Sequence, residues 1–459
     1  MNELTNFDQT AEARDIAYHM HAYTNAVRHA EVGPMIIEGG EGIYVEDNEG
    51  RRYIEGMAGL WSVGVGFNDQ RLIKAATDQL QKLPFYHNFG HKSHAPAIDL
   101  AEQLIAIAPV PMSKVFYTNS GSEANDTVLK MIWYRSNAMG KPEKKKVISR
   151  MRGYHGVTIA SASLTGLPNN HKSFDLPIDR VLHTMAPHFW KDGNPGETEE
   201  EFATRCANEL EAMIQREGPE TVAAFWAEPV MGAGGVVVPP KTYYEKIQAV
   251  LEKHDILFVA DEVICGFGRT GNMFGSETMG IRPDVIVMSK QITSSYIPFS
   301  AIMMNDRVYG PIAEESNRIG TFGHGFTAGG HPLGAAVALA NLAVIQDNDL
   351  VANARDVGAH LLGRLHGLAD SPLVGEVRGI GLIAAVELVE DKATKSVSTA
   401  GKLGGLMNNA MMRNGLISRN MYDAVAFCPP LIITRAQADD LFEIVAKSLG
   451  ELEAELGVA

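Results

Sequence analysis

Short apolar segments alternate with longer amphipathic ones through the middle of this 459-residue chain, from about residue 70 to 335. The apolar segments are rich in β-branched and aromatic residues and end at polar residues or glycine, which predicts buried strands of a parallel sheet. Because strands that alternate with helices form βαβ units, we expect helices on both faces of this sheet. The predicted strands are residues 115–117, 146–149, 222–226, 256–260, 285–288 and 300–304.

The two ends of the chain follow different patterns. Residues 35–56 alternate apolar and polar positions around glycine and Asp-Asn turns, as a small antiparallel sheet would. Beyond about residue 340, two alternating stretches, 377–388 and 424–433, stand among helical patterns that include 435–456. We therefore predict an α/β protein with a large domain at 66–339, built on a mostly parallel central sheet covered by helices. A smaller α+β domain at 340–459 is joined by the N-terminal segment 1–65.

Charge and cysteine content narrow the class of protein. The formal net charge is −15, and the only cluster of basic residues is the short run 144–146, which argues against nucleic acid or an anionic membrane as a partner. Three cysteines without CxxC spacing argue against a disulfide framework or structural zinc and favour a reducing compartment. The polar, acidic start resembles no secretory signal, and no apolar run approaches about 20 residues. We expect a cytoplasmic protein.

A carboxylate and an amine follow two of the predicted strands. Asp261 closes the apolar run 256–260, and Lys290 follows the run 285–288. The carboxyl ends of parallel strands meet at the edge where open α/β sheets bind ligands. In a dry site there, a lysine can hold pyridoxal phosphate (PLP) as a Schiff base while a carboxylate faces the pyridine nitrogen. When each residue is considered alone, the simpler interpretations are a solvated lysine for Lys290 and a helix-capping or ion-paired carboxylate for Asp261.

The segment 117–125 predicts an anion site. It follows a strand and opens a helix at about 122–137, where free N–H groups and the helix dipole bind phosphate. Gly121 allows close approach of the backbone, and Ser120 and Ser122 add hydroxyl groups. The alternative is a capping box, because Ser120 and Glu123 have that spacing.

Three further segments contribute candidate residues. Tyr154 is placed to stack on a planar cofactor with His155 in support, and Val263 can press on a flat ring; packing is the alternative for the Tyr-His pair. Thr327 lies in a glycine-rich turn and can contact a phosphate. The two histidines of that turn lack a recognised zinc spacing, so we expect no metal site. Residues 266–271 match GxGxxG, but no clear helix opens at the third glycine, so we interpret them as a turn.

Taken together, these segments resemble the class III aminotransferases of the fold-type I PLP enzymes. The motifs NSGSEAND, YHG, AEPV, VADEV with GFGRTG, SK before TSS, HGFTAGGHP and FCPPL occur in the order of that family and cover nearly the whole chain.

The resemblance implies a homodimer, possibly a dimer of dimers, with the active site at the subunit interface. It assigns Lys290 to the Schiff base and Asp261 to the pyridinium. It places Gly121 and Ser122 at the phosphate, together with Thr327 of the neighbouring subunit and Phe326 beside it. The remaining cofactor contacts implied are Ser120, Tyr154, His155, Glu228 and Val263.

Within the family the chain looks most like the ω-amino acid or amine:pyruvate transaminases. That likeness places Trp61, Phe89 and Tyr154 in the substrate pocket, and it makes Arg419 a mobile residue that binds the acceptor carboxylate. A surface ion pair is the alternative for Arg419. The reaction implied is a ping-pong transfer of an amino group to an α-keto acid, with pyruvate the acceptor expected in this subgroup and Lys290 the proton carrier.

Three rival functions remain at this point. A decarboxylase or an aminomutase of the same fold would need the same Lys290 and Asp261. An NAD-dependent oxidoreductase built on residues 266–271 belongs to another class, and a non-catalytic PLP-binding protein is a third possibility. The sequence does not choose among β-alanine, taurine, a diamine or an aryl-alkyl amine as donor.

Overall fold

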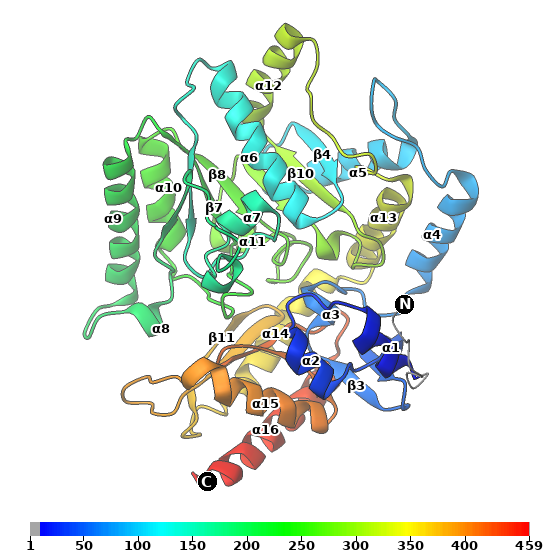
Figure 1. The fold of residues 1–459 in the computed structure, drawn as a ribbon, viewed down its shortest axis with the longest axis vertical. Helices are drawn as coiled ribbons and strands as arrows, with labels where there is room; N and C mark the ends of the chain where they lie inside the picture. Colours follow the sequence, from blue (N-terminus) through cyan, green and yellow to red (C-terminus); the bar gives the residue numbers. More distant parts are fainter. Residues whose placement is uncertain (1–9, 459) are drawn as a thin grey trace, which may run out of the picture.

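A computed structural model describes residues 10–458 and is built around one seven-stranded sheet (Figure 1). Neighbouring strands follow the order β4-β10-β9-β8-β7-β5-β6. All pairs are parallel except those of β10, which runs antiparallel to both β4 and β9. The strands are β4 (Lys114–Thr118), β5 (Lys146–Arg150), β6 (Val181–Thr184), β7 (Val222–Ala227), β8 (Leu257–Asp261), β9 (Val285–Met288) and β10 (Ser300–Met304).

The six strands predicted for this sheet are present, and their ends differ from the prediction by at most one residue. β6 was missed because it has only four residues and its second half, His183 and Thr184, is polar. The mixed α/β architecture with a mostly parallel central sheet is thus confirmed.

Helices cover both faces of the sheet, as expected for strands that are apolar on both sides. One face packs against α6 (Gly121–Ala138), α7 (Ile159–Leu164) and α12 (Asp306–Ile319). The other face packs against α9 (Glu199–Glu217) and α10 (Tyr243–Lys253) at one end and against α5 (Ala95–Ala106) and α13 (Pro332–Asp347) at the other. Successive residues alternate between the two cores: Val287 faces α6, while Ile286 and Met288 face the α13 side.

Two smaller sheets lie beside the large one. The first has the order β1-β2-β3-β13, in which β13 of the C-terminal part pairs in parallel with β3. The second has the order β11-β12-β15-β14. Their strands are β1 (Ile37–Glu41), β2 (Tyr44–Asp47), β3 (Arg52–Glu55), β11 (Val374–Ile380), β12 (Ile383–Leu388), β13 (Leu416–Ile417), β14 (Arg419–Met421) and β15 (Ala424–Phe427).

The N-terminal segment and the C-terminal part therefore share a sheet. The stretch 377–388 is a hairpin, because a turn at Gly381 divides it into β11 and β12. The division of the chain at residues 65 and 339 stays a prediction; residue 339 itself lies inside α13.

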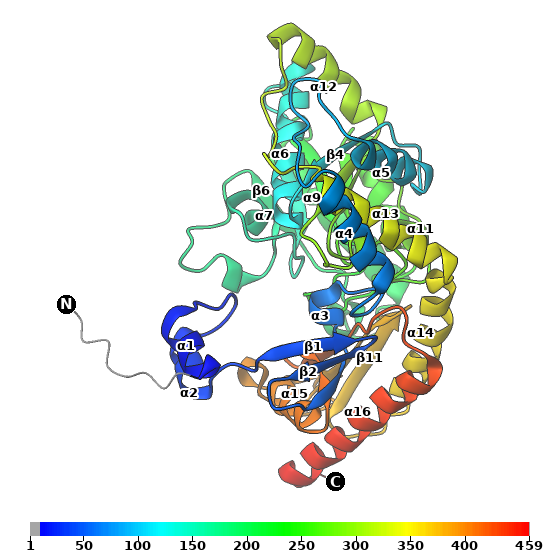
Figure 2. The same ribbon diagram turned by 90° about the vertical axis from the view of Figure 1, so that its right-hand side faces the viewer.

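The remaining helices are mostly short connections or cover the small sheets. They are α1 (Ala11–Tyr18), α2 (Ala26–Val32), α3 (Ala58–Trp61), α4 (Gln70–Lys82), α8 (Phe189–Asp192), α11 (Gly275–Met279), α14 (Leu350–His366), α15 (Lys402–Arg413) and α16 (Arg435–Leu456), with 3-10 turns Pro168–Asn170, Lys290–Ile292 and Thr399–Gly401. α1 and α2 bury no residue in the protomer and project from its side (Figure 2). Within residues 10–458 no single helix is long and apolar enough to span a membrane; only the bent pair α13 and α14 passes that test jointly.

Candidate active site

Lys290 and Asp261 lie together at one edge of the large sheet. Asp261 ends β8, and Lys290 begins the 3-10 turn that follows β9, two residues beyond Met288. Because β8 and β9 are parallel neighbours, both side chains reach the carboxyl edge, as predicted. There they line a cavity of about 100 Å³. Its other lining residues are Gly121, Ser122, Tyr154, His155, Gly156, Glu228, Val263, Ile264 and Ser289.

The backbone at Lys290 is unusual. Its φ of 50° is in the left-handed region, which a residue with a side chain adopts at a cost. Its carbonyl oxygen accepts the N–H of Ser295 at 3.0 Å, which holds the tight turn in place. The turn ends the extended backbone of β9, so the chain leaves the sheet at Lys290. Lys290 is thus held by its backbone at the point where the cavity opens.

Burial changes the acidity of this amine. Desolvation lowers the pKa of Lys290 to about 8, although the negative charges of Asp261 and Glu228 oppose the shift. At pH 7 a pKa of 8 leaves about one tenth of the amine neutral, whereas the ordinary pKa of 10.5 leaves about one part in three thousand. Because only the neutral amine is a nucleophile, Lys290 is suited to covalent attachment of a carbonyl compound.

This shift predicts how PLP attachment depends on pH. In the PLP-free protein, the rate of covalent attachment to Lys290 should rise about tenfold per pH unit below 8 and level off above it, because the neutral fraction then saturates. Stopped-flow absorbance after mixing with PLP measures the rate. A rate that keeps rising to pH 10 would show that Lys290 titrates like a solvated lysine.

Three donors fix the Asp261 carboxylate. Its Oδ2 accepts hydrogen bonds from His155 Nδ1 at 2.8 Å and from Asn125 Nδ2 at 2.9 Å, and its Oδ1 accepts one from the N–H of Val263 at 3.1 Å. His155 must carry its proton on Nδ1, because an ionised carboxylate only accepts. The arrangement presents a fixed negative charge to the cavity, as a partner of a pyridinium requires.

Asn125 is a site residue to which the sequence analysis gave no role. Its Nδ2 also donates to the carbonyl oxygen of His155 at 2.7 Å, and its Oδ1 accepts the indole N–H of Trp226 at 2.8 Å. It therefore ties α6, the Tyr-His loop, β7 and β8 together behind Asp261. The signal was available, because Asn125 belongs to the quoted NSGSEAND motif, but an amide in a helix pattern carries no chemistry of its own.

The helix start predicted to bind an anion is present at α6. Gly121 and Ser122 line the cavity, and a Cβ added at Gly121 would lie 3.2 Å from Val263, so glycine leaves the opening free. The Ser120 hydroxyl instead caps the helix, because it accepts the N–H of Glu123 at 3.2 Å. Only half of the capping box is present, because the Glu123 carboxylate accepts the backbone N–H of Asn119 and not that of Ser120. The predicted contact of Ser120 with the cofactor stays a prediction.

Glu228 and Tyr154 form another side of the cavity. Glu228 accepts the backbone N–H of Tyr154 at 2.9 Å on one oxygen and that of Gly232 at 2.9 Å on the other. Burial raises the pKa of Tyr154 well above its usual value, and the neighbouring Tyr23 adds to the shift. Tyr23 is a second residue that the sequence analysis missed, because it lies in the N-terminal segment, far along the chain from every motif used.

The two remaining pocket candidates of this protomer lie next to the cavity. Trp61 is buried in a cluster that contains Ile264, which itself lines the cavity. Arg419 begins β14, and its positive charge adds to the lowering of the Lys290 pKa and opposes the rise in the Tyr154 pKa. Within the described residues Arg419 forms no ion pair, in contrast to Arg378. The surface ion pair proposed as its alternative role is therefore not formed.

Phe89, Phe326 and Thr327 are not brought to this cavity within one protomer. Phe89 and Phe326 line a different, wide pocket of about 1370 Å³ on the outer side of β4, and Thr327 lies in the same loop as Phe326. Residues 266–271 form turns, and the next helix begins only at Gly275, which agrees with their interpretation as a turn. Arg269 inside this turn donates to the carbonyl oxygens of Leu382 and Pro429, a structural role.

The residues around the cavity fit PLP. A fixed carboxylate stands where a pyridine nitrogen needs a partner, a helix start offers N–H groups to a phosphate, and a lysine of lowered pKa lies between them. A side chain at position 121 would crowd Val263 on the cavity wall, so glycine keeps that space open for a ligand. Lys290, Asp261, Gly121, Ser122, Tyr154, His155 and Val263 would hold the cofactor.

Comparison with known proteins agrees with this geometry. The sequence profile of "Aminotransferase class-III" matches residues 25–449. The "Gamma-aminobutyrate transaminase 1, mitochondrial" of Oryza sativa subsp. japonica is 46% identical over 94% of this chain and 84% of its own. The corresponding protein of Solanum lycopersicum is 47% identical over the same shares.

Solved structures are closer in sequence. The ω-transaminase of Pseudomonas jessenii, in complex with PMP, superposes with a TM-score of 0.97 at 57% identity and covers 98% of this chain and 100% of its own. A structure described as a transaminase with L-alanine has a TM-score of 0.91 at 65% identity and covers 92% of this chain and 100% of its own.

Proposed function

Because this chain belongs to the class III aminotransferases and depends on PLP, we propose that it transfers the amino group of an ω-amino acid or primary amine to pyruvate. One observation carries the choice of substrates. Arg419, which forms no ion pair among the described residues, is near the reactive Lys290 beside the cavity, and the buried Trp61 belongs to the apolar cluster that adjoins the cavity through Ile264. A keto acid needs that cation, and an amine without a carboxylate needs the apolar wall.

Relatives support both halves of the proposal. A 57% identical structure is an ω-transaminase, and the curated relatives act on γ-aminobutyrate according to their names. A 65% identical structure holds L-alanine, which is the amino acid formed when pyruvate accepts an amino group. Pyruvate is therefore the acceptor that we propose first.

The chain's own residues would share the work as follows. PLP, when bound, supplies an electron sink for the negative charge that develops at the substrate carbon. Lys290 would remove the proton from that carbon as a general base and then return it to the cofactor as a general acid, which its pKa near the working pH allows. Asp261, held by His155 and Asn125, keeps a negative charge opposite the ring nitrogen. Gly121 and Ser122 hold the phosphate with backbone N–H groups.

Arg419 gives a prediction specific to the acceptor. Arg419→Ala should raise the KM for pyruvate about 10- to 100-fold, since a charge-assisted contact to a carboxylate contributes about 1.5–3 kcal/mol. The KM for 1-phenylethylamine, which has no carboxylate, should change less than about threefold. Steady-state kinetics with both substrates measure the difference. Arg413→Ala, at an exposed arginine of the preceding helix, is the matched control. Equal changes in both KM values would contradict the role of Arg419.

The proposal as a whole is tested by alanine formation from pyruvate with purified, PLP-loaded protein. The donors are β-alanine, taurine, putrescine, γ-aminobutyrate and 1-phenylethylamine. Stoichiometric alanine from any donor supports the proposal and excludes a decarboxylase or aminomutase, which consume no keto acid. Alanine from no donor would overturn pyruvate as acceptor, and 2-oxoglutarate would then be tried in its place. Within this proposal, γ-aminobutyrate is the ω-amino acid donor that the curated relatives favour.

We also propose that the working unit is a homodimer. Phe89, Phe326 and Thr327 are expected at the active site, yet they line or adjoin a different pocket of the protomer, so a second copy is the natural source of these residues. Hybrids that combine a Lys290→Ala chain with a Thr327→Asp chain should recover activity, because one of their two sites has both residues intact. Hybrids as inactive as the two parents would contradict shared sites.

For location, we propose a reducing compartment, the cytoplasm. The three cysteines, Cys206, Cys265 and Cys428, are buried and free. Burial raises the pKa of all three, which keeps them in the unreactive thiol form. Intact thiols in protein isolated from unstressed cells would agree with this proposal.

A further inference from the structure

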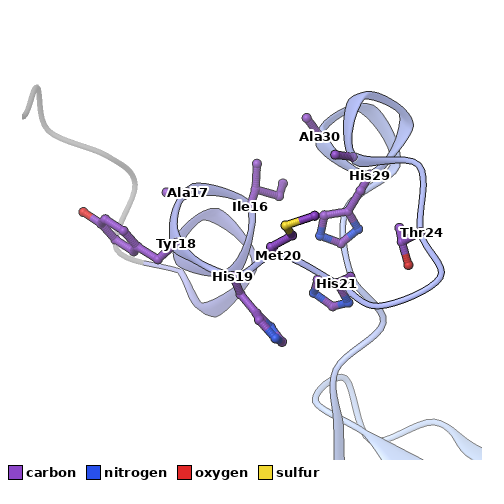
Figure 3. A pocket seen from close by; sticks show the side chains of 10 residues that line it. Ile16, Ala17, Tyr18, His19, Met20, His21, Thr24, His29 and Ala30 are labelled. Carbon is purple, nitrogen blue, oxygen red and sulfur yellow. The ribbon is translucent and has the colours of Figure 1, made fainter. Parts of the chain in front are cut away.

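Three histidines surround one carboxylate in the projecting N-terminal segment. Asp15 lies in α1, and His29 lies in α2. His19 and His21 come just after α1, with one residue between them. In Figure 3 the rings of His21 and His29 lie one above the other between the two helices, with His19 beside them. None of these residues takes part in the transamination described above.

All three imidazoles are directed at Asp15. His19 Nδ1 lies 3.0 Å from Asp15 Oδ1, and His21 Nε2 and His29 Nε2 lie 2.8 and 3.0 Å from Oδ2. The ring centroids of His21 and His29 are 4.2 Å apart, and those of His19 and His21 are 4.4 Å apart. One nitrogen from each of His19 and His21 and one oxygen of Asp15 all lie within 4.8 Å of one another.

These spacings match those of a transition-metal site. Zinc binds imidazole nitrogen and carboxylate oxygen at about 2.0–2.1 Å, which sets neighbouring ligand atoms of a tetrahedron about 3.3 Å apart. The nitrogen-to-oxygen distances here are a few tenths of an ångström shorter. Asp15, His19 and His21 already meet the spacing of a metal site, and His29, which lies outside this group of three but contacts the same carboxylate, would complete the set after a rotation of its side chain.

We propose that Asp15, His19, His21 and His29 form a binding site for one divalent transition-metal ion of the zinc class. Three imidazoles and one carboxylate favour ions of this class over Mg²⁺ and Ca²⁺, because Mg²⁺ and Ca²⁺ bind oxygen ligands. A half-open pocket of about 280 Å³, lined by all three histidines, gives the ion a path from solvent.

A metal ion in this segment would stabilise its fold. α1 and α2 bury no residue, so no apolar core of the protomer holds this segment together. His29 and Asp15 are nevertheless largely shielded, with side chains 12% and 19% exposed. An ion bound there would join α1, the loop and α2 at one point.

The loop that the ion would fix leads to the active site. Tyr23 lies between His21 and α2, accepts a hydrogen bond from Asn170 Nδ2 at 2.6 Å, and neighbours Tyr154 at the cavity. Metal binding would therefore order the segment that positions Tyr23. The ion itself would lie away from the reacting atoms. It would act as a structural ion, because the cluster shares no residue with the cavity of Lys290.

The test uses full-length, tag-free, PLP-loaded protein that has been treated with a chelator and then freed of it. Titration with Co²⁺ should show one equivalent bound per protomer, with the strong visible absorption of four-coordinate cobalt, and Zn²⁺ should displace it. His21→Gln/His29→Gln should weaken binding at least about 100-fold, since loss of one supporting contact alone costs 10- to 100-fold. His366→Gln, at an exposed histidine on α14, should bind like the wild type.

Two outcomes would overturn the proposal: no stoichiometric binding by the wild type, or equal binding by the double variant. The cofactor cannot confuse the result, because the double variant retains it. His21→Gln alone, with circular dichroism of each variant, separates loss of the site from loss of the fold. As a second readout, Zn²⁺ should slow proteolytic cleavage between residues 10 and 33 at least about tenfold in the wild type and leave the double variant unchanged.

Discussion

Lys290→Ala should abolish turnover, with kcat reduced by at least about 10⁴-fold. The variant loses the amine that carries the proton. The two carboxylates of the described cavity cannot replace it, because Asp261 already accepts three hydrogen bonds and Glu228 accepts two from backbone N–H groups. PLP should remain bound through the start of α6, so the loss is one of chemistry. Alanine formation from pyruvate measures kcat, and mass spectrometry should show no covalent PLP.

The controls for this variant separate the lysine from its surroundings. Lys82→Ala, at an exposed lysine in the last turn of α4, should leave kcat unchanged. Small primary amines added to Lys290→Ala should restore part of the rate, because they can carry the proton in place of the missing side chain. Substantial turnover by Lys290→Ala without added amine would overturn the role given to Lys290.

Asp261→Asn should reduce kcat about 10²- to 10³-fold while PLP binding is retained. The amide carries no charge and cannot hold a proton on the ring nitrogen, so the electron sink is weaker. Its geometry also conflicts with the site. Asp261 Oδ1 and Oδ2 both accept hydrogen bonds, and an NH₂ group in either place would face a donor. Steady-state kinetics, with PLP content measured for each preparation, check this expectation.

Two comparisons sharpen the test of Asp261. Asp78→Asn, at an exposed carboxylate on α4, should have no effect on kcat. Asn125→Ala removes one donor to Asp261 and leaves the charge, so its effect should be smaller, about tenfold. A near-normal rate for Asp261→Asn would contradict its role, and a larger loss in Asn125→Ala than in Asp261→Asn would show that Asn125 does more than orient the carboxylate.

The central part of the site was predictable because it depends on one geometrical rule. The carboxyl ends of neighbouring parallel strands share an edge, so two polar residues that each end an apolar run must lie near each other. Asp261 and Lys290 satisfy that rule, and the structure places both at one cavity. The fold class was predictable because the apolar runs were long enough to be recognised as strands and alternated regularly with helical segments.

What was missed depends on contacts between distant segments. Asn125 donates a hydrogen bond to Asp261 and accepts one from Trp226, and neither residue stands out in a helix or strand pattern. The expectation that no metal site exists considered cysteine spacing and the histidines at 324 and 331. That expectation stays a prediction; it did not consider the cluster around Asp15, where His29 meets His21 only because a turn brings α2 back beside α1.

Two other predictions depend on how copies of the chain meet. Phe89 was placed at the active site by resemblance alone and Thr327 by its glycine-rich turn together with the resemblance, and the protomer keeps both apart from the cavity of Lys290. No pattern within one chain can show which surface a second copy brings to the cavity.

The pairing of β13 with β3 determines when the protein can finish folding during synthesis. Ile54 leaves the ribosome long before its strand partner Leu416 is made. The large sheet is complete by Met304, so it can form while the first sheet still lacks its fourth strand. Newly made chains that stall before residue 416 should therefore hold a folded central sheet with an unpaired strand edge at β3, which is where chaperones would be needed.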